Sequence, residues 1–331
     1  MAIAQSAVLR SIVTVHTKLF AAIALVTGVI LLTACGGGDG KKFPDTVVIG
    51  ADDIRPELVS TELVTGKNRF AFALIDQQSG LLIIDADVHM AFYRLYEDGK
   101  EEMRFELDAM SSVPARDAGI EEAIEHTHGD GSVHIHANVG EQVGIYTAVV
   151  EFDEAGRWGV ELQIETADRK ETILPSFSVG TVSTTVTIGA DAPRSVNRTV
   201  DDVDDLALID SSAEPSEEMH TETIAEAIEA GRPVLVLFAV PGYCTSQLCG
   251  PEYEIMRKLY PQYRDRVSFI HVEPFEVPSS PDKVLVQAAK DFGLETEPWF
   301  FMIDAEGKVS MKFEGPTSMQ ELVTAMEDVL R

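Results

Sequence analysis

Apolar and polar residues alternate with a period of two along several short stretches of the first half of the chain, as in Val88-His-Met90-Ala-Phe92. Successive side chains of a strand point to opposite faces, so this pattern predicts half-buried β-strands. Turn signals such as Glu97-Asp-Gly99 separate the stretches. Short strands at this spacing predict two packed sheets. The expected strands are Arg69–Ile75, Leu81–Tyr96, Met103–Asp108, Ile145–Phe152, Trp158–Glu165 and Phe177–Ile188.

The last third of the chain alternates between helix and strand patterns. Thr223-Ile-Ala-Glu226 and Ser318-Met-Gln-Glu321 are capping boxes that predict helix starts. Uninterrupted apolar runs predict buried strands at Val234–Ala239 and Val267–Val272. The expected order is a βαβ unit, a hairpin and a terminal helix. The remaining expected elements are a helix through Tyr260, a helix at Pro281–Phe292, and hairpin strands at Phe300–Ile303 and Lys308–Phe313.

These patterns predict a multidomain fold. An all-β sandwich of immunoglobulin type occupies residues 46–190, and an α/β domain occupies residues 220–331. Residues 191–219 are dense in acidic side chains, with Pro and Ser, which predicts a solvated linker between the two.

The N-terminus has the pattern of an export signal. Residues 1–34 carry Arg10 and Lys18 but no acid, and the apolar stretch Leu19–Leu32 precedes Leu32-Thr-Ala-Cys35. That motif resembles a bacterial lipobox. The resemblance implies a signal peptide over residues 1–34, a lipid on Cys35 and a tether over residues 35–45, so that the folded domains lie outside the cell membrane. The alternative is a single transmembrane anchor, for which a stretch of 14 residues is short against the roughly 20 that a span needs.

The formal net charge of −29 limits the classes of molecule that the protein can bind. So acidic a surface repels nucleic acid and anionic headgroups, which excludes both as partners of the folded domains. The membrane is then reached only through the lipid on Cys35.

Cys244 and Cys249 are the candidate reactive residues. They follow the predicted buried strand and the Pro241-Gly-Tyr243 turn, and they lead into a helix. Backbone N–H groups at a helix start stabilise a thiolate, and an oxidising exterior permits a disulfide between the two.

This segment, together with Glu297-Pro298-Trp299, resembles the thioredoxin/TlpA superfamily over roughly 115 residues. The resemblance implies a thioredoxin-like domain, a cis Glu297–Pro298 bond facing the cysteines, and thiol–disulfide exchange. Cys244 would attack and Cys249 would resolve the mixed disulfide. The substrates would be thiols and disulfides of cell-envelope proteins, and no soluble cofactor is required. Tyr243, Glu297 and Trp299 would help to dock a partner chain, with core packing as the alternative for Trp299.

Two features depart from that family. Four residues separate the cysteines instead of two, and positions i and i+5 of one helix lie about 7.5 Å apart along its axis, too far for a disulfide. We therefore expect Cys244 to precede the helix. Glu252, Glu254 and Glu297 add negative charge, which opposes thiolate formation.

Three alternatives stay open. The Cys-Thr-x-x-x-Cys spacing is similar to one class of peroxiredoxins, but Leu237 and Pro241 stand where the Pro and Thr of their motif belong. A Sco-type copper chaperone would pair the cysteines with His271, which lies on a predicted strand where a structural role is more common. The third alternative is a non-catalytic binding module in which Cys244 and Cys249 form a structural disulfide.

A loop in the first half concentrates half of the eight histidines: His126, His128, His134 and His136. If Gly129–Val133 form the hairpin loop, His128 faces His134 and His126 faces His136. All four rings would then share a face and could bind Zn²⁺ or Cu²⁺. A two-residue turn would split them, and a solvated polar loop is the alternative.

Overall fold

The structure is a computed structural model that describes residues 42–43, 53–120, 124–127, 133–136, 143–243, 251–280 and 282–331. The predicted signal peptide, Cys35 and most of the predicted tether lie outside these residues. Among the described residues, no helix combines the length and apolar character that a membrane span requires.

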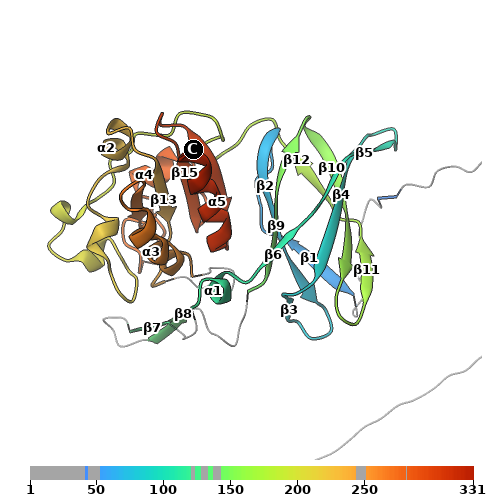
Figure 1. The fold of residues 1–331 in the computed structure, drawn as a ribbon, viewed down its shortest axis with the longest axis horizontal. Helices are drawn as coiled ribbons and strands as arrows, with labels where there is room; N and C mark the ends of the chain where they lie inside the picture. Colours follow the sequence, from blue (N-terminus) through green and yellow to red (C-terminus); the bar gives the residue numbers. More distant parts are fainter. Residues whose placement is uncertain are drawn as a thin grey trace, which may run out of the picture. The chain divides into compact units, whose positions relative to one another are not determined.

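The chain is β-rich, with several antiparallel sheets (Figure 1). Two five-stranded antiparallel sheets are built from residues 54–179. The first runs in the order β1, β2, β9, β6 with β3 beside β2, and the second in the order β11, β10, β4, β5 with β12 beside β10. The first sheet contains β1 (Ile54–Leu58), β2 (Gly66–Asp76), β3 (Leu82–Ile83), β6 (Met110–Ser112) and β9 (Ile145–Phe152). The second contains β4 (Asp87–Leu95), β5 (Glu101–Asp108), β10 (Gly156–Glu165), β11 (Lys170–Ile173) and β12 (Ser176–Val179).

One hydrophobic core joins these two sheets. Phe72 on β2 stacks on Tyr146 of β9, while Phe92 on β4 lies edge-on to Phe70. Trp158 on β10 is fully buried and donates its indole N–H to Glu154 O. Aromatic side chains from both sheets thus meet between them, as the period-two pattern predicted.

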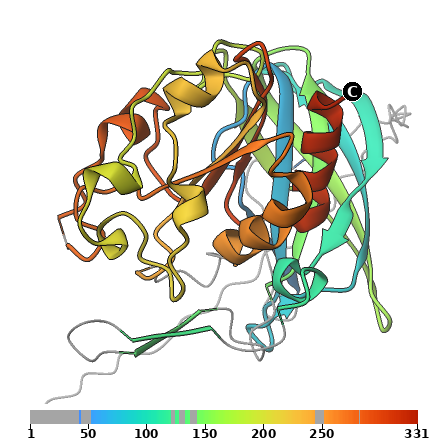
Figure 2. The same cartoon turned by 60° about the vertical axis from the view of Figure 1, so that its left-hand side comes forward.

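A four-stranded sheet follows, in the order β14, β13, β15, β16. Strand β13 pairs parallel to β14 and antiparallel to β15. Its alternate residues enter two cores: Leu235 and Leu237 pack with α3 and α5, whereas Val236 and Phe238 pack with α2 and α4. Helices therefore cover both faces of this sheet, as Figures 1 and 2 show. The elements are α2 (Ile224–Glu229), β13 (Val234–Phe238), α3 (Glu252–Tyr263), β14 (Ser268–Val272), α4 (Gln287–Asp291), β15 (Trp299–Ile303), β16 (Val309–Glu314) and α5 (Met319–Val329).

Both predicted capping boxes are confirmed. The Thr223 hydroxyl accepts from Glu226 N, and the Glu226 carboxylate accepts from Thr223 N. Ser318 and Glu321 make the same reciprocal pair at the start of α5. These motifs position the two helices because they satisfy N–H groups that the first turn leaves unpaired.

Three predicted elements are wrong in extent. The strand expected at Leu81–Tyr96 is two strands, because β3 pairs with β2 in the first sheet and β4 pairs with β10 and β5 in the second. The strand expected at Phe177–Ile188 ends at Val179, because the chain leaves its sheet there and Val186 N bonds to Phe292 O. The helix expected at Pro281–Phe292 begins only at Gln287. Just before it, Leu285 makes an antiparallel bridge with Phe275, and extended pairing excludes helix there.

The segment expected to be a solvated linker is only partly solvated. Val200–Asp202, Leu206–Leu208 and Glu217–Met219 form short 3₁₀ helices, and most of the acidic residues between 201 and 205 are exposed. Asp210, Ser211 and Ser212 are buried instead. The acidic composition therefore predicted the exposed stretch but not the buried turn that follows it.

A paired network of buried charges, here called the Arg69 network, consists of Arg69, Glu321, Glu62 and Lys312. The Arg69 guanidinium on β2 donates to the Glu321 carboxylate on α5 at 2.7 and 3.1 Å, and also to the carbonyls of Glu314 and Pro316. The Lys312 ammonium on β16 lies 2.9 Å from the Glu62 carboxylate. These contacts tie β2 and the loop before it to β16 and α5.

Candidate functional site

The two cysteines predicted to be reactive, Cys244 and Cys249, lie outside the described residues, as does the rest of 244–250. The structure does describe both ends of their segment. Strand β13 ends at Phe238, the turn continues to Tyr243, and α3 begins at Glu252. Tyr243 is half-buried in that turn, where its N–H donates to Val240 O.

The Glu297–Pro298 peptide bond is cis, which confirms that prediction. The Glu297 carboxylate accepts a hydrogen bond from Val240 N at 3.4 Å. The segment before β15 therefore lies beside the residues that lead from β13 into the cysteine segment. Trp299 is 4% exposed and stacks on Phe301, as the core-packing alternative for this residue implied.

Next to this turn is a buried group of which the sequence analysis had singled out only His271. It is here called the Asp210 cluster and consists of Asp210, His220, His271 and Glu273. His220 Nε2 lies 3.4 Å from Asp210 Oδ2 and 3.4 Å from His271 Nδ1. The oxygen and the two nitrogens all lie within 4.8 Å of one another, and such a group could hold a metal ion. All four side chains are buried.

Asp210 is held by donors on several sides. The Tyr253 hydroxyl and Ser216 N donate to Oδ2, and Ser212 N donates to Oδ1. Burial alone would raise the pKa of this carboxyl, but its hydrogen bonds and the nearby imidazoles outweigh burial and hold the pKa below its usual value. Asp210 is therefore an anion at neutral pH.

His271 turns the lone pair of Nδ1 towards His220. Its Nε2–H donates to Ala239 O at 3.1 Å, so Nδ1 is the unprotonated nitrogen of the neutral ring and faces His220. Burial lowers the pKa of His271 to about 4, which keeps the ring neutral at pH 7. The hydrogen bond to Ala239 also joins the cluster to the end of β13.

Glu273 completes the cluster with a carboxyl group that burial makes hard to ionise. Its Oε1 accepts from Ser211 N at 2.8 Å, and its Oε2 has no hydrogen-bond partner among the described residues. Burial raises the pKa of Glu273 to about 8. At neutral pH this group is a protonated acid that can donate.

Residues 210–212 pack directly against the turn after β13. Gly242 N donates to Ser211 Oγ at 3.0 Å. A Cβ at Gly242 would lie 2.1 Å from Ser211 O, so only glycine permits this close approach. The buried cluster thus packs against the turn that precedes the cysteine segment in the sequence.

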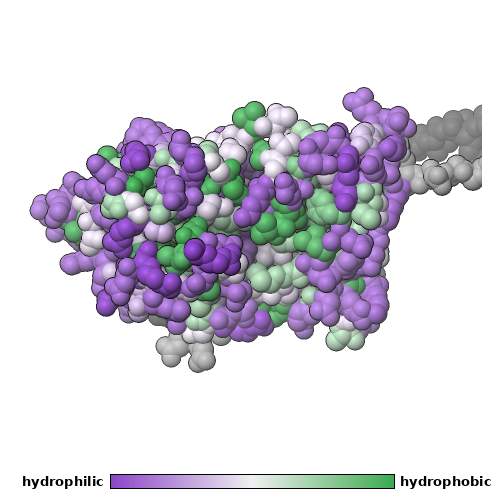
Figure 3. Space-filling view, turned by 45° about the horizontal axis from the view of Figure 1, so that its top comes forward, coloured by the Kyte–Doolittle hydropathy of each residue, from purple (hydrophilic) through white to green (hydrophobic). Residues whose placement is uncertain are grey.

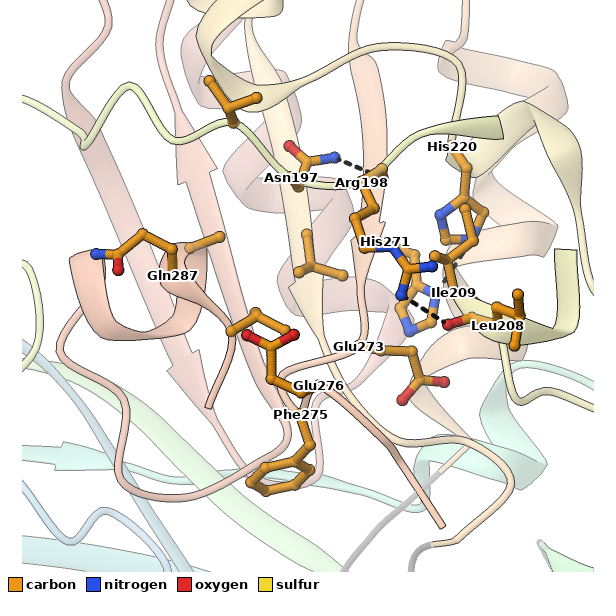
Figure 4. Close-up of a pocket in the computed structure, with 14 residues that line it drawn as sticks. Asn197, Arg198, Leu208, Ile209, His220, His271, Glu273, Phe275, Glu276 and Gln287 are labelled. Carbon is orange, nitrogen blue, oxygen red and sulfur yellow. Dashed lines mark hydrogen bonds between the residues drawn. The ribbon is translucent and has the colours of Figure 1, made fainter. Parts of the chain in front are cut away.

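A cavity of about 210 Å³ opens beside the cluster (Figure 4). His220, His271 and Glu273 line one part of it, and Arg198 extends over it with a hydrogen bond to Leu208 O. The volume is large enough for several water molecules. Other lining residues are Asn197, Ile209, Phe275, Glu276 and Gln287.

The histidine loop pairs in a different register from the predicted one. β7 (Ile124–Thr127) and β8 (Val133–His136) form a ladder in which His126 is opposite His134 and His136 is opposite Ile124. The expected pairing of His126 with His136 is therefore wrong by two positions. The last pair of this ladder is Thr127 with Val133, and His128 lies outside the described residues. The side chains of these histidines lie outside the described part of the structure.

Sequence reasoning missed Asp210, His220 and Glu273. Asp210 was assigned to an acidic linker, although it directly follows the apolar run Leu206-Ala-Leu-Ile209, which is the signal of a segment entering a core. His220 stands between that segment and α2, with no periodic pattern around it. Their proximity to His271 is a tertiary contact across 51 residues of sequence or more.

No protein-family model matches the chain, and no curated protein matches it significantly.

On the face shown in Figure 3, hydrophilic residues form most of the surface and hydrophobic ones gather in smaller patches near the middle of the view. The polar surface agrees with the acidic composition and charge of −29.

Proposed function

We propose that the protein is a thiol–disulfide oxidoreductase of the cell envelope that works through Cys244 and Cys249. One observation carries the proposal. The hydrogen bond from Val240 N to Glu297 Oε2 joins the two segments that a thioredoxin-like redox site needs, namely the turn into the cysteines and the residue before Pro298.

The order of the C-terminal sheet supports a thioredoxin-like fold for residues 220–331. A parallel β13–β14 pair, an antiparallel β15–β16 hairpin and helices on both faces are the elements of that fold. The two five-stranded sheets before it support an immunoglobulin-like sandwich over residues 46–190.

The exchange needs no cofactor. The Cys244 thiolate attacks one sulfur of a partner disulfide, forms a mixed disulfide and releases the first partner thiolate. The Cys249 thiolate then attacks Cys244 Sγ, closes the intramolecular disulfide and releases the second partner thiolate. Two electrons pass from the pair to the partner, and the reverse sequence oxidises a partner dithiol.

Glu297, one of the acidic residues expected to oppose a thiolate, has a raised pKa. Burial raises the pKa of Glu297, so this carboxyl keeps its proton to a higher pH than an exposed glutamate. A neutral carboxyl repels a nearby thiolate less than a carboxylate does. Glu297 therefore opposes exchange less than its formal charge implies.

Export and lipid attachment at Cys35 are part of the same proposal. A Cys35→Ser variant should move from the membrane to the soluble fraction of cells, whereas the unchanged chain should remain in the membrane fraction. Retention of the variant in the membrane would contradict lipid anchoring.

Trapping experiments test the exchange. In a Cys35→Ser background the only thiols are those of Cys244 and Cys249, because the chain has three cysteines. Adding Cys249→Ser should accumulate mixed disulfides with envelope proteins or a model disulfide peptide. Adding Cys244→Ser instead should accumulate few, because the first attack is lost. If neither variant accumulates mixed disulfides, the proposal is wrong. Rapid consumption of peroxide by the protein would favour the peroxiredoxin alternative.

A further inference from the structure

We propose that Asp210, His220 and His271 form a binding site for a divalent transition-metal ion, of which Zn²⁺ is the representative. This site is separate from the cysteines and from the histidine loop. It goes beyond thiol–disulfide exchange and does not depend on it.

The spacing of the ligand atoms fits such an ion. Two ligands bound to one tetrahedral ion at 2.0–2.1 Å lie roughly 3.3–3.4 Å from each other. Asp210 Oδ2 and His271 Nδ1 each lie 3.4 Å from His220 Nε2. Each of the three residues also offers a ligand atom within 4.8 Å of one from each of the others, so a small closure brings three ligand atoms onto one ion.

The chemistry of the donors fits as well. Two imidazoles and one carboxylate are a ligand set that Zn²⁺ and ferrous iron both use. The set carries one negative charge in a buried place, and a divalent cation offsets that charge. Bound metal would also replace the hydrogen bonds that now run through His220 Nε2.

The groups behind the ligands are those that orient metal ligands in proteins. A ligating histidine usually donates its other ring N–H to a carbonyl or carboxylate, and His271 Nε2–H donates to Ala239 O at 3.1 Å. The Asp210 carboxylate accepts from Tyr253 and from two backbone N–H groups. His220 differs, because its Nδ1 is buried and has no hydrogen-bond partner among the described residues, so only His271 and Asp210 have this support.

Three protein ligands leave one coordination position for water or a small ligand, as in catalytic rather than structural zinc sites. The cavity of about 210 Å³ borders His220 and His271 and supplies the space. Glu273 lines the same cavity with one oxygen unpaired in the described structure, so a metal-bound water has a hydrogen-bond partner there.

Metal titration of the full chain tests the site in a background that removes the competing ligands. This background replaces all three cysteines by Ser and the four loop histidines by Ala: Cys35→Ser, Cys244→Ser, Cys249→Ser, His126→Ala, His128→Ala, His134→Ala and His136→Ala. After chelator treatment, Co²⁺ is added and its visible absorption followed, and Zn²⁺ competition gives the affinity. We expect one ion per chain, with tetrahedral bands and no thiolate charge transfer.

Variants in this background locate the ion. His220→Ala and Asp210→Asn should each abolish stoichiometric binding. Tyr253→Phe removes only a hydrogen bond to the ligand carboxylate and should weaken binding about 10–100-fold. Tyr260→Phe, on the same helix but outside the cluster, should leave the affinity unchanged.

The site is overturned if the background chain binds no ion, or if His220→Ala binds as tightly as its parent. Circular dichroism checks that each variant is folded. Should His220→Ala and Asp210→Asn fail to fold, Tyr253→Phe decides, because an affinity equal to that of Tyr260→Phe contradicts the site.

Discussion

Two buried polar networks of this protein differ in how their charges are satisfied. In the Arg69 network each anion meets a cation: Arg69 bonds to Glu321, and Lys312 bonds to Glu62. The Asp210 cluster holds two carboxyl groups and two histidines, and no lysine or arginine forms an ion pair with either carboxyl among the described residues. It also leaves His220 Nδ1 and Glu273 Oε2 without partners there.

The difference separates structural from functional use of buried charge. A fully paired network holds elements together and has nothing left to bind. The Asp210 cluster has unpaired atoms, opposite pKa shifts on its two acids and a cavity beside it. Such an arrangement destabilises the fold relative to a packed apolar core, so a structural role alone does not account for it. We therefore assign a structural role to the Arg69 network and propose a functional role for the Asp210 cluster.

The largest expected effect comes from breaking the Arg69 pair. Arg69→Met leaves the Glu321 carboxylate buried without its cation, because the Arg69 side chain is only 3% exposed and that of Glu321 only 9%. The variant should lose about 3–5 kcal/mol of unfolding free energy. Urea unfolding followed by tryptophan fluorescence measures the loss.

Arg55→Met is the matched control for Arg69→Met. Arg55 pairs with Glu57 on the surface, where each side chain is over 40% exposed, so the change should cost less than about 1 kcal/mol. Similar losses in the two variants would remove the distinction between buried and exposed pairs.

The second prediction concerns how the stabilisation by Glu62 depends on pH. Burial alone would raise the pKa of Glu62, but hydrogen bonds from Thr185, Lys312 and Ser183 outweigh burial and lower it to about 2. The folded-state pKa lies below the unfolded-state value, so the stabilisation is present above about pH 4.5 and is lost as the pH falls towards 2. Because solvent screens this half-buried group, Glu62→Gln should cost about 1–2 kcal/mol at pH 7 and progressively less below pH 4.5.

Unfolding measured between pH 2 and pH 7 checks this dependence. A constant difference between the unchanged chain and Glu62→Gln across that range would show that Glu62 does not act through its charge.

The third prediction concerns the stability that the Asp210 cluster contributes, for comparison with the Arg69 network. Tyr253→Phe keeps the ring but removes the hydroxyl that donates to Asp210. Because Ser212 N and Ser216 N still donate to the same carboxylate, the metal-free variant should lose only about 1–2 kcal/mol. A loss as large as that of Arg69→Met, measured in the same urea experiment, would give both networks a structural role.

The smallest effect is expected at Glu297. Burial raises its pKa, so the unfolded chain releases this proton at a lower pH than the folded chain does, and stability falls as the pH rises between the two values. Glu297→Gln should therefore become more stable than the unchanged chain as the pH rises through that range.

Glu295→Gln makes the same change at an exposed position two residues away and should stay within about 0.5 kcal/mol at every pH. Thermal unfolding at several pH values measures both variants. A Glu297→Gln variant that follows the control would contradict the burial of that carboxyl.

Much of the local structure could be predicted from the sequence. The capping boxes at Thr223 and Ser318 and the uninterrupted apolar strand at Val234 act over a few residues, and their elements formed where expected. The Phe177 strand and the Pro281 helix failed because each is cut short by a backbone contact with a distant segment. The histidine register failed because periodicity does not fix where a hairpin closes.

The candidate site was predictable only in part. The turn after β13 and the position of Pro298 follow from short motifs that specify local geometry. The Asp210 cluster does not, since Asp210, His220 and His271 come from three separate segments and only the folded chain brings them together. Composition assigned Asp210 to solvent because burial of a single carboxylate depends on donors that lie elsewhere in the sequence.

The reduction potential of the Cys244–Cys249 pair in the full chain tests thiol–disulfide exchange most directly. The chain is equilibrated in graded thiol–disulfide buffers, and the fraction of free thiol is measured at each composition. A potential between roughly −120 and −270 mV, within the range of exchange catalysts, is the predicted result. A potential below about −300 mV would mark a structural disulfide and contradict the proposed function.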